Sequence, residues 1–274
     1  MTRISRRGFG KLAAAAVGTA GIGTLLSPNV ARGAGGRIAV VGGGFGGATA
    51  AKYLRMLDDS LEVTLVEPKK TFHTCPFSNL VLGGVKKLTD IEHRYDALER
   101  TYGVKVVHAR AAKIDGAAKT VTLSDGSSVP FDRAIVSPGI GFRAPPVEGY
   151  TAGAAEKVPH AWSAGPQTAL LRSQLEAMPD GGTVIICPPP NPFRCPPGPY
   201  ERASMIAHYL KTNKPKSKIL ILDAKEKFSK QGLFMPAWEE VYGDMIEWRA
   251  ASAGGKVSRI DIGAMEVTTE FGAD

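Results

Sequence analysis

The feature that most constrains the fold of this 274-residue chain is a glycine motif in register with two strands, a helix and an acidic residue. Residues 37–41 are a short apolar strand, and residues 48–57 have helical spacing. Three glycines between them complete the pattern G-x-G-x-x-G: Gly42, Gly44 and Gly47. A second strand over residues 63–66 ends in Glu67. This order predicts a βαβ unit of the dinucleotide-binding type.

Each part of this unit has a physical role in holding a dinucleotide. Glycines permit a tight turn and let the backbone approach a pyrophosphate closely, and the helix N-terminus attracts its negative charge. Glu67 can accept hydrogen bonds from ribose hydroxyls. A merely glycine-rich turn would not bring all these elements into register, so we predict dinucleotide binding.

The segments after Glu67 favour FAD over NAD. They are, in order, a long excursion, a strand, a hairpin, an apolar strand and a small-Pro-Gly turn: residues 68–100, 104–108, 119–131, 134–136 and 137–139. This order, ending at Gly139, resembles the FAD domain of two-dinucleotide flavoprotein reductases, whereas simple dehydrogenases continue with further βα units. We therefore expect a glutathione-reductase-like α/β fold, with an incomplete FAD-binding domain over residues 35–150.

The second half repeats the strand–loop–helix layout without the glycines. Helices and strands are expected at residues 168–178, 183–187, 199–212, 218–222 and, as one further strand, 263–272. The loop from Cys187 to Arg202 reads C-P-P-P-N-P-F-R-C-P-P-G-P-Y-E-R. Prolines remove N–H donors and stiffen the turn, so the loop serves a nicotinamide cofactor poorly. Residues 151–274 are expected to form a second Rossmann-like domain that lacks the glycine motif.

The proline-rich loop instead fixes a thiol, Cys195, at a helix N-terminus, where the helix dipole favours thiolate. This arrangement predicts a redox site with Cys195 as its catalytic residue. The alternative is an inert structural thiol, but a cysteine between Arg194 and Pro196 in such a loop has little to pack against. Cys187 ends a strand expected to be buried, and a core position is favoured for it over a Cys187–Cys195 disulfide.

Residues 1–34 are expected to be a twin-arginine signal peptide. The sequence S-R-R-G-F-G-K at residues 5–11 fits the twin-arginine pattern, and an apolar run at residues 12–26 precedes the small-residue cleavage site A-R-G. The run is too short and too rich in glycine and alanine to span a membrane comfortably, which argues against a membrane anchor. We expect periplasmic localisation and no stable membrane insertion.

The leader also explains the basic composition. It holds five basic residues and no acidic one, so its removal lowers the formal net charge from +8 to +3. No basic block with interleaved aromatic residues remains, which disfavours nucleic-acid binding. The five histidines have no metal-ligand spacing, and no metal site is predicted.

The mature chain resembles, over essentially its whole length, the flavoprotein subunit of flavocytochrome c sulfide dehydrogenase. The matching stretches are V-V-G-G-G-F-G-G-A-T-A-A-K-Y-L, T-C-P-F-S-N-L-V-L-G-G, P-H-A-W, F-R-C-P-P-G-P-Y-E-R-A-S and F-S-K-Q. The resemblance implies that Cys75 is linked through sulfur to the 8α-methyl of FAD and that Cys195 is half of a redox disulfide beside the flavin. It also implies that Ala111 lies near the adenine. For Cys75 the alternative is a small buried hydrophobic residue, against which its proline-adjacent loop argues.

This resemblance implies periplasmic oxidation of sulfide to sulfur or polysulfide. Electrons would pass through the disulfide and FAD to a haem c on a separate cytochrome subunit. The second redox cysteine and the C-terminal domain of that family have no counterpart before Asp274, so the chain is expected to be C-terminally truncated. Two other hypotheses are a relative of sulfide:quinone reductase, which would need a C-terminal pair of amphipathic membrane helices, and a non-catalytic flavin-binding fragment.

The leader yields a direct test of export. Replacing Arg6→Lys together with Arg7→Lys is expected to leave the protein in the cytoplasm, because the exporter reads both guanidinium groups. Immunoblots of periplasmic and cytoplasmic fractions measure this. An unchanged periplasmic yield would contradict the twin-arginine assignment.

Overall fold

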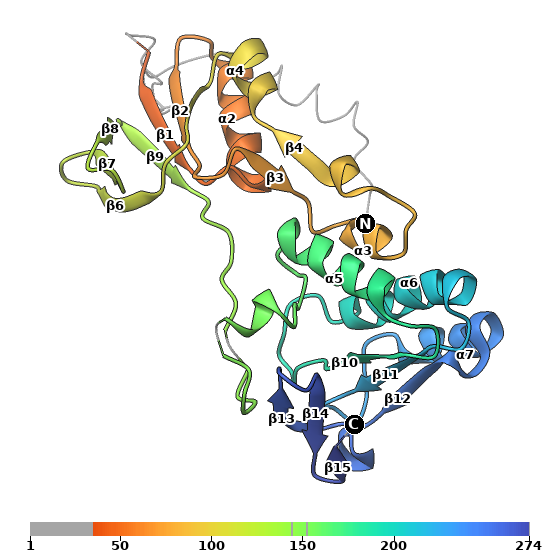
Figure 1. Ribbon diagram of the computed structural model, residues 1–274. Coiled ribbons are helices and arrows are strands. Elements are labelled where there is room, and N and C mark those ends of the chain that lie inside the picture. The colour runs from red at the N-terminus through yellow and green to blue at the C-terminus, as the bar shows by residue number, and fades with distance from the viewer. Residues whose placement is uncertain (1–34, 144, 152, 274) are drawn as a thin grey trace, which may run out of the picture. The chain divides into compact units, whose positions relative to one another are not determined.

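The computed structural model describes residues 35–143, 145–151 and 153–273 (Figure 1). The signal peptide expected at residues 1–34 therefore lies outside the described residues. The described part has the predicted α/β fold, with one parallel sheet in each half of the chain.

The first sheet contains four parallel strands in the order β5-β2-β1-β9. Their bounds are β1 Arg37–Val41, β2 Glu62–Val66, β5 Lys105–Val107 and β9 Arg133–Val136. Strand β1 lies between β2 and β9, so the chain reverses its direction of progress across the sheet beside β1. In open α/β sheets, ligands bind outside the carboxyl ends of the strands at such a switch point.

Both faces of this sheet are covered, which is why its strands are mainly apolar. Ile38 and Val40 pack in one hydrophobic cluster with residues of α2 (Phe45–Leu57) and α4 (Asp96–Tyr102). Ala39 and Val41, the alternate residues of β1, pack in a second hydrophobic cluster with residues of a three-stranded antiparallel sheet. That sheet contains the expected hairpin and comprises β6 Ala111–Asp115, β7 Thr120–Leu123 and β8 Ser128–Pro130.

The long excursion after β2 carries short elements of its own. These are β3 Thr71–His73, α3 Ser78–Leu82, the 3-10 helix η1 Leu88–Ile91 and β4 Glu92–Arg94, with β3 and β4 paired antiparallel. Helix α3 packs against α5 (Pro166–Ala177) and α6 (Gly198–Asn213), as Figure 1 shows. Leu82 of α3 is fully buried in the main cluster of the second half. The excursion is thereby anchored against α6.

The second sheet has three parallel strands in the order β10-β11-β12, with bounds Thr183–Ile186, Lys218–Leu222 and Ile246–Arg249. Helices α6 and α7 (Gln231–Tyr242) make the crossovers and share a core with Ile219 and Ile221 of β11. The opposite face, with Leu220 and Leu222, contacts Val267 of a small antiparallel sheet. The predicted helices at 168–178 and 199–212 and the predicted strands at 183–187 and 218–222 are confirmed. The remaining 3-10 helices are η2 Ala154–Glu156, η3 Gly243–Met245 and η4 Ala251–Ala253.

The single strand predicted over residues 263–272 is wrong. The chain there forms part of an antiparallel sheet of β13 Val257–Asp261, β14 Glu266–Thr269 and β15 Gly272–Ala273. Asp261 causes the break, because its Oδ1 accepts hydrogen bonds from the backbone N–H groups of Gly263 (2.9 Å) and Ala264 (3.0 Å). An aspartate that binds the backbone two residues on stabilises a turn.

Candidate functional site

The glycine loop after β1 is held in a conformation that only glycine fits. Gly42 has φ +98°, and a Cβ there would lie 2.1 Å from the carbonyl oxygen of Ser137. A Cβ on Gly47 would lie 1.7 Å from the carbonyl oxygen of Gly42. The loop after β1 therefore touches the Ser137 turn after β9, at the switch point of the sheet.

The N-terminus of α2 is available to an anion. Gly44 is its N-cap, no side chain caps it, and its first turn holds no acidic residue. The first N–H groups of a helix have no partner within the helix and carry positive partial charge. This arrangement fits a pyrophosphate, and it supports the prediction that Gly42, Gly44 and Gly47 bind a dinucleotide.

Glu67 lies directly at this loop. Its Oε2 accepts a hydrogen bond from the backbone N–H of Gly43 at 2.8 Å, and its Oε1 accepts one from the backbone N–H of Lys69 at 2.9 Å. Tyr95 donates its hydroxyl to the Gly43 carbonyl at 3.1 Å. Burial, and then the charge of Glu67, raise the pKa of Tyr95 to about 12, so the hydroxyl stays protonated. Each carboxylate oxygen of Glu67 has a further lone pair for ribose hydroxyls.

The two remaining predicted contacts lie near the same sheet edge. Gly139 follows β9 with φ +79°, and a Cβ at this position would meet no neighbouring atom within 4 Å, so its surroundings are open. Ala111 begins β6, four residues after the end of β5, and is partly buried beside the Val121 cluster. The roles of Gly139 and Ala111 in cofactor binding remain predictions.

Cys75 lies in the turn between β3 and α3. It is partly buried, and its carbonyl accepts the Ser78 N–H at 2.9 Å, which closes the turn. Phe77, the N-cap of α3, has φ +72° and is 62% exposed. The turn thus presents a thiol beside an exposed aromatic ring.

Cys195 lies at the other end of the predicted site, in the proline loop before α6. It is exposed, has φ +61°, and its carbonyl accepts the Gly198 N–H at 2.9 Å. A Cβ on Gly198 would lie 3.2 Å from the Cys195 sulfur and 2.9 Å from the indole of Trp162. The sulfur therefore sits beside the start of α6 and close to the Trp162 ring.

Arg202, which the sequence did not single out, connects the two cysteine segments. It is 5% exposed and donates from Nε to the Asn79 side-chain oxygen at 3.1 Å and from its two Nη atoms to the carbonyls of His160 and Ala161. Its Cζ lies 3.6 Å above the Trp162 ring.

The electrostatic environment of Arg202 includes both cysteines. Burial lowers the pKa of Arg202 to about 10, while interactions with Cys75 and Cys195 oppose this shift. The guanidinium therefore stays charged at neutral pH. Through its bond to Asn79, Arg202 links α6, which follows Cys195, to α3, which follows Cys75.

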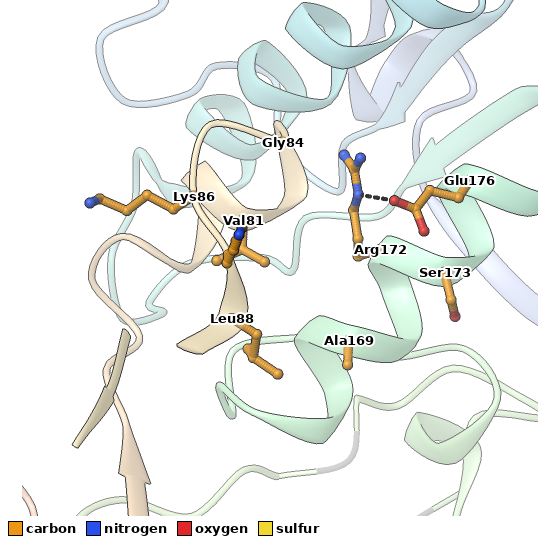
Figure 2. A pocket seen from close by; sticks show the side chains of 9 residues that line it. Val81, Gly84, Lys86, Leu88, Ala169, Arg172, Ser173 and Glu176 are labelled. Carbon is orange, nitrogen blue, oxygen red and sulfur yellow. Dashed lines mark hydrogen bonds and ion pairs between the residues drawn. The ribbon is translucent and has the colours of Figure 1, made fainter. Parts of the chain in front are cut away.

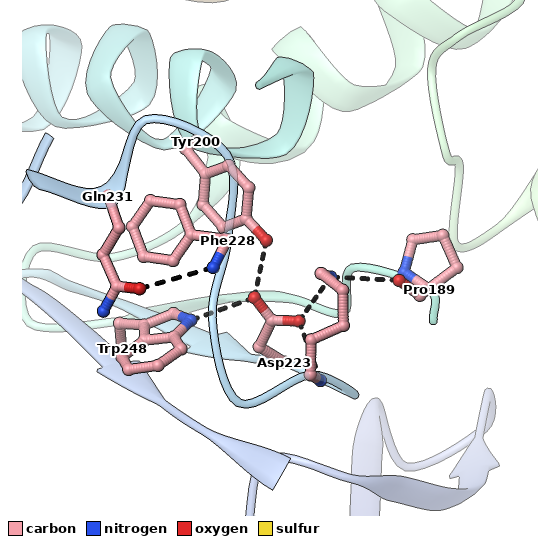
Figure 3. A network of polar contacts seen from close by, with 7 residues as sticks. Pro189, Tyr200, Asp223, Phe228, Gln231 and Trp248 are labelled. Atoms are coloured by element: carbon pink, nitrogen blue, oxygen red, sulfur yellow. Dashed lines mark hydrogen bonds and ion pairs between the residues drawn. The ribbon is translucent and has the colours of Figure 1, made fainter. Parts of the chain in front are cut away.

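A second buried network fixes the proline loop (Figure 3). Asp223, directly after β11, is fully buried and accepts from the Tyr200 hydroxyl at 2.5 Å and from the Trp248 indole at 3.0 Å. Its other oxygen pairs with Lys225 at 2.5 Å, and Lys225 also donates to the Pro189 carbonyl at 3.0 Å. Burial, and then Asp223, raise the pKa of Tyr200, so Tyr200 stays a donor.

Asp223 occupies the position in the second half that Glu67 occupies in the first. In a nucleotide-binding half, the acid after the second strand receives ribose hydroxyls. Here Tyr200, Trp248 and Lys225 already bind the carboxylate, and the preceding loop lacks the glycines. The residues present do not fit a nicotinamide dinucleotide in the second half.

The core position expected for Cys187 is wrong. The residue is exposed, because β10 ends at Ile186 and the chain turns into the proline loop there. Protein atoms around the sulfur nevertheless raise the pKa of Cys187 to about 12 by desolvation. All three cysteines are free thiols in the structure, so neither the Cys187–Cys195 disulfide nor any other is formed.

A cavity of about 390 Å³ lies away from these residues (Figure 2). Val81 and Gly84 line one side, and Arg172 and Glu176 of α5, paired at 2.8 Å, line the other. None of the predicted site residues lines this cavity. Within the described ranges, no group of acidic, histidine or cysteine side chains could hold a metal ion, and no helix is long and apolar enough to cross a membrane.

Fold and site together define a flavoprotein oxidoreductase with two α/β halves, and comparisons with known proteins agree. Residues 36–177 match the family model of pyridine nucleotide-disulphide oxidoreductases. Residues 168–274 match the model for the central part of the sulfide dehydrogenase (flavocytochrome c) flavoprotein chain. Over 45 residues, 16% of this chain and 94% of the relative, the chain is 73% identical to the sulfide dehydrogenase (flavocytochrome c) flavoprotein chain of Chlorobaculum thiosulfatiphilum. The chain therefore belongs to the pyridine nucleotide-disulphide oxidoreductases and, among them, to the sulfide dehydrogenase flavoprotein chains, a family whose cofactor is FAD.

Two further comparisons, one of sequence and one of structure, match proteins of Aquifex aeolicus whose names state that they act on sulfide and quinone. The chain is 31% identical to the sulfide-quinone reductase of Aquifex aeolicus over 103 residues, which is 37% of this chain and 24% of that protein. The crystal structure of the sulfide:quinone oxidoreductase from Aquifex aeolicus has a TM-score of 0.64 at 21% identity, over 86% of this chain and 54% of that one. The second comparison shows a shared fold. The chain covers 24% of the relative's length in the sequence comparison and 54% in the structural one.

The buried network predicts a specific loss of stability. Asp223→Asn is expected to lower the free energy of unfolding by about 3–5 kcal/mol, because it leaves the buried Lys225 cation unpaired. Urea unfolding followed by tryptophan fluorescence measures this. Asp244→Asn is the matched control, since Asp244 pairs with Lys218 at 2.8 Å on an exposed surface and its loss should leave the midpoint unchanged. Equal effects of the two substitutions would contradict the role given to Asp223.

Proposed function

We propose that this chain carries the flavin-binding and sulfide-accepting residues of a periplasmic FAD-dependent sulfide dehydrogenase whose electrons pass to a c-type cytochrome subunit. The observation that carries the proposal is that Arg202, inside the helix that follows Cys195, binds Asn79 in the helix that follows Cys75 at 3.1 Å. Family membership supports the flavin, and the 73% identity over 45 residues supports the sulfide chemistry.

The residues of the first half fit FAD in a consistent way. The uncapped N-terminus of α2 would receive the pyrophosphate, and Glu67 would accept from a ribose hydroxyl. The Cys75 sulfur would form a thioether with the flavin, which would keep the cofactor bound after export. When bound, FAD supplies a two-electron acceptor that can release electrons one at a time.

Cys195 would receive the sulfur of the substrate. Hydrosulfide attacks the Cys195 sulfur within a disulfide, a new S–S bond makes a persulfide, and the second cysteine leaves as a thiolate with the electron pair of the broken bond. The resemblance places that second cysteine outside the three cysteines of this sequence. Re-formation of the disulfide releases one sulfur atom in the zero oxidation state together with a proton and two electrons, for which FAD, when bound, would be the acceptor.

The second half supports an electron acceptor other than a nicotinamide cofactor. Asp223 is fully occupied by internal donors, and prolines replace the phosphate-binding glycines. A cytochrome at the outside of the flavin site would instead accept electrons without entering a nucleotide pocket. The twin-arginine pattern supports a periplasmic location for this reaction.

Sulfide:quinone reduction is the second candidate, favoured by the 31% identity over 103 residues to the Aquifex aeolicus enzyme. The two candidates differ in the acceptor. Co-purification of the full-length protein with a haem protein supports the first, and sulfide-dependent reduction of a soluble quinone without it supports the second.

The cofactor assignment is tested with Cys75→Ser. Acid precipitation of the wild-type protein is expected to give a yellow pellet, because a thioether survives denaturation, whereas the Cys75→Ser variant should release its flavin into the supernatant. Cys187→Ser is the matched control and should keep the yellow pellet. Flavin that washes out of the wild-type protein would exclude attachment at Cys75.

The sulfide assignment is tested with Cys195→Ser in the full-length protein. The variant is expected to bind FAD but to lose sulfide-driven bleaching of the flavin, because a serine oxygen cannot form the disulfide that accepts hydrosulfide. Dithionite should still reduce its flavin. Stopped-flow absorbance at the flavin band measures both reactions, and bleaching at the wild-type rate would show that electrons bypass Cys195.

A further inference from the structure

Arg202 is a buried cation without an acidic partner among the described residues. Its donors all go to neutral oxygens: the Asn79 amide and the carbonyls of His160 and Ala161. The contrast with Lys225 is direct, because that buried cation has the Asp223 carboxylate at 2.5 Å. Neutral acceptors satisfy hydrogen bonds but leave the net charge of Arg202 uncompensated.

Such a charge is costly unless an anion approaches it. Removing a charge from water carries a penalty, and hydrogen bonds to neutral groups offset only part of it. The groups that favour the charged form of Arg202 are the sulfurs of Cys75 and Cys195. An anionic sulfur would therefore complete this site.

Geometry brings the Cys195 sulfur, the Trp162 ring and the guanidinium together. A Cβ placed on Gly198 would lie within 3.3 Å of both the Cys195 sulfur and the Trp162 indole. The Arg202 guanidinium carbon lies 3.6 Å above the centre of the same indole ring. Trp162 fixes the plane of Arg202 by stacking, since a planar guanidinium stacks well on an aromatic face. Asn79 fixes its other edge from α3, the helix that follows Cys75.

We propose that Arg202 is a positioning residue that stabilises anionic sulfur on Cys195, as a thiolate and, resting on the proposed function, as a persulfide. If Cys75 is a thioether to the flavin, it carries no charge, and the whole field of Arg202 acts on Cys195. Cys195 would then leave faster as a thiolate when the outer sulfur of its persulfide is attacked, because a stabilised thiolate is the better leaving group.

The other titratable groups around Arg202 do not supply this anion. Burial, and then Arg202, lower the pKa of His160, so the His160 ring is neutral at neutral pH. Glu201 and Arg194 are exposed, and water screens their charges. Of His160, Glu201, Arg194 and Arg202, only Arg202 is both buried and charged.

The test uses the chemistry of each thiol in the 274-residue protein. The three cysteines are alkylated near neutral pH with neutral iodoacetamide or anionic iodoacetate, and peptide mass spectrometry gives a rate for each. Arg202→Gln is expected to slow alkylation of Cys195 at least about tenfold. Arg202→Lys should lose less, because it keeps the charge. N-acetylcysteine amide is the reference thiol, and Arg172→Gln is the matched variant because Arg172 also stacks on an aromatic ring, Tyr209, at 4.1 Å.

The charge of the reagent separates an electrostatic role from a merely structural one. A cation beside Cys195 raises the rate ratio of iodoacetate to iodoacetamide at Cys195 in the wild-type protein above the ratio for N-acetylcysteine amide, and Arg202→Gln should abolish the difference. A structural role would change both rates together and leave the ratio unaltered. The wild-type ratio decides the question even if Arg202→Gln fails to fold.

Equal ratios for Cys195 of the wild-type protein and for N-acetylcysteine amide would overturn the proposal. So would an unchanged Cys195 rate in a folded Arg202→Gln variant. A different result would contradict the proposed function. That result is sulfide-driven bleaching of the flavin in the Cys195→Ser variant, and it does not depend on the alkylation rates.

Discussion

The buried pair of Asp223 and Lys225 is the interaction on which the position of the proline loop depends. The proline loop has few backbone donors, so it cannot hold itself in place through a regular hydrogen-bond ladder. Lys225 supplies what the loop lacks, because it donates to the Pro189 carbonyl and lies 5.0 Å from the centre of the Phe193 ring. Asp223 compensates the charge of Lys225 inside the protein. The position of Cys195, two residues after Phe193, follows from this chain of contacts.

The two halves show how one layout serves two purposes. Each half has a strand, a loop, a helix and a second strand that ends in an acidic residue. In the first half the loop is rich in glycine, no side chain caps the helix, and Glu67 is partly exposed. A ligand can therefore reach the loop and the helix N-terminus. In the second half the loop is rich in proline, and the equivalent acid, Asp223, is fully buried and bound by three side chains. Asp223 occupies the position of a ribose-binding acid, but it stabilises the loop that holds the Cys195 thiol.

The local elements could be predicted from the sequence because their signals are local. Apolar runs give the strands of both sheets, and glycine spacing gives the turn at Gly42. The turn at Asp261 was missed because its aspartate acts through a side-chain bond to the backbone, which hydrophobic periodicity does not reveal. Cys187 was misplaced because β10 ends one residue earlier than its apolar run suggests, which leaves the residue in the loop.

The electrostatic part of the site could not be predicted, since it joins distant segments. Arg202 meets Asn79 from the excursion and Trp162 from the linker before α5, and no spacing in the sequence links these three residues. A weak signal existed in R-C-P-P-G-P-Y-E-R, where the arginine lies one helical turn inside α6, among the buried residues Tyr200 and Ile206. A charged residue at a position where the helix is otherwise buried requires a partner.

The two buried cations differ in how their charge is compensated. Lys225 has a permanent carboxylate partner, so its charge is balanced in every state of the protein, and its contribution is to stability. Arg202 has only neutral hydrogen-bond partners among the described residues, and a thiol beside it, such as Cys195, gains a negative charge when it ionises. A fixed cation that is balanced only when a neighbouring sulfur becomes anionic favours that anionic state over the neutral one. Permanent compensation of Arg202 by a carboxylate would have made the site more stable, but it would have removed the energetic preference for thiolate that sulfur exchange requires.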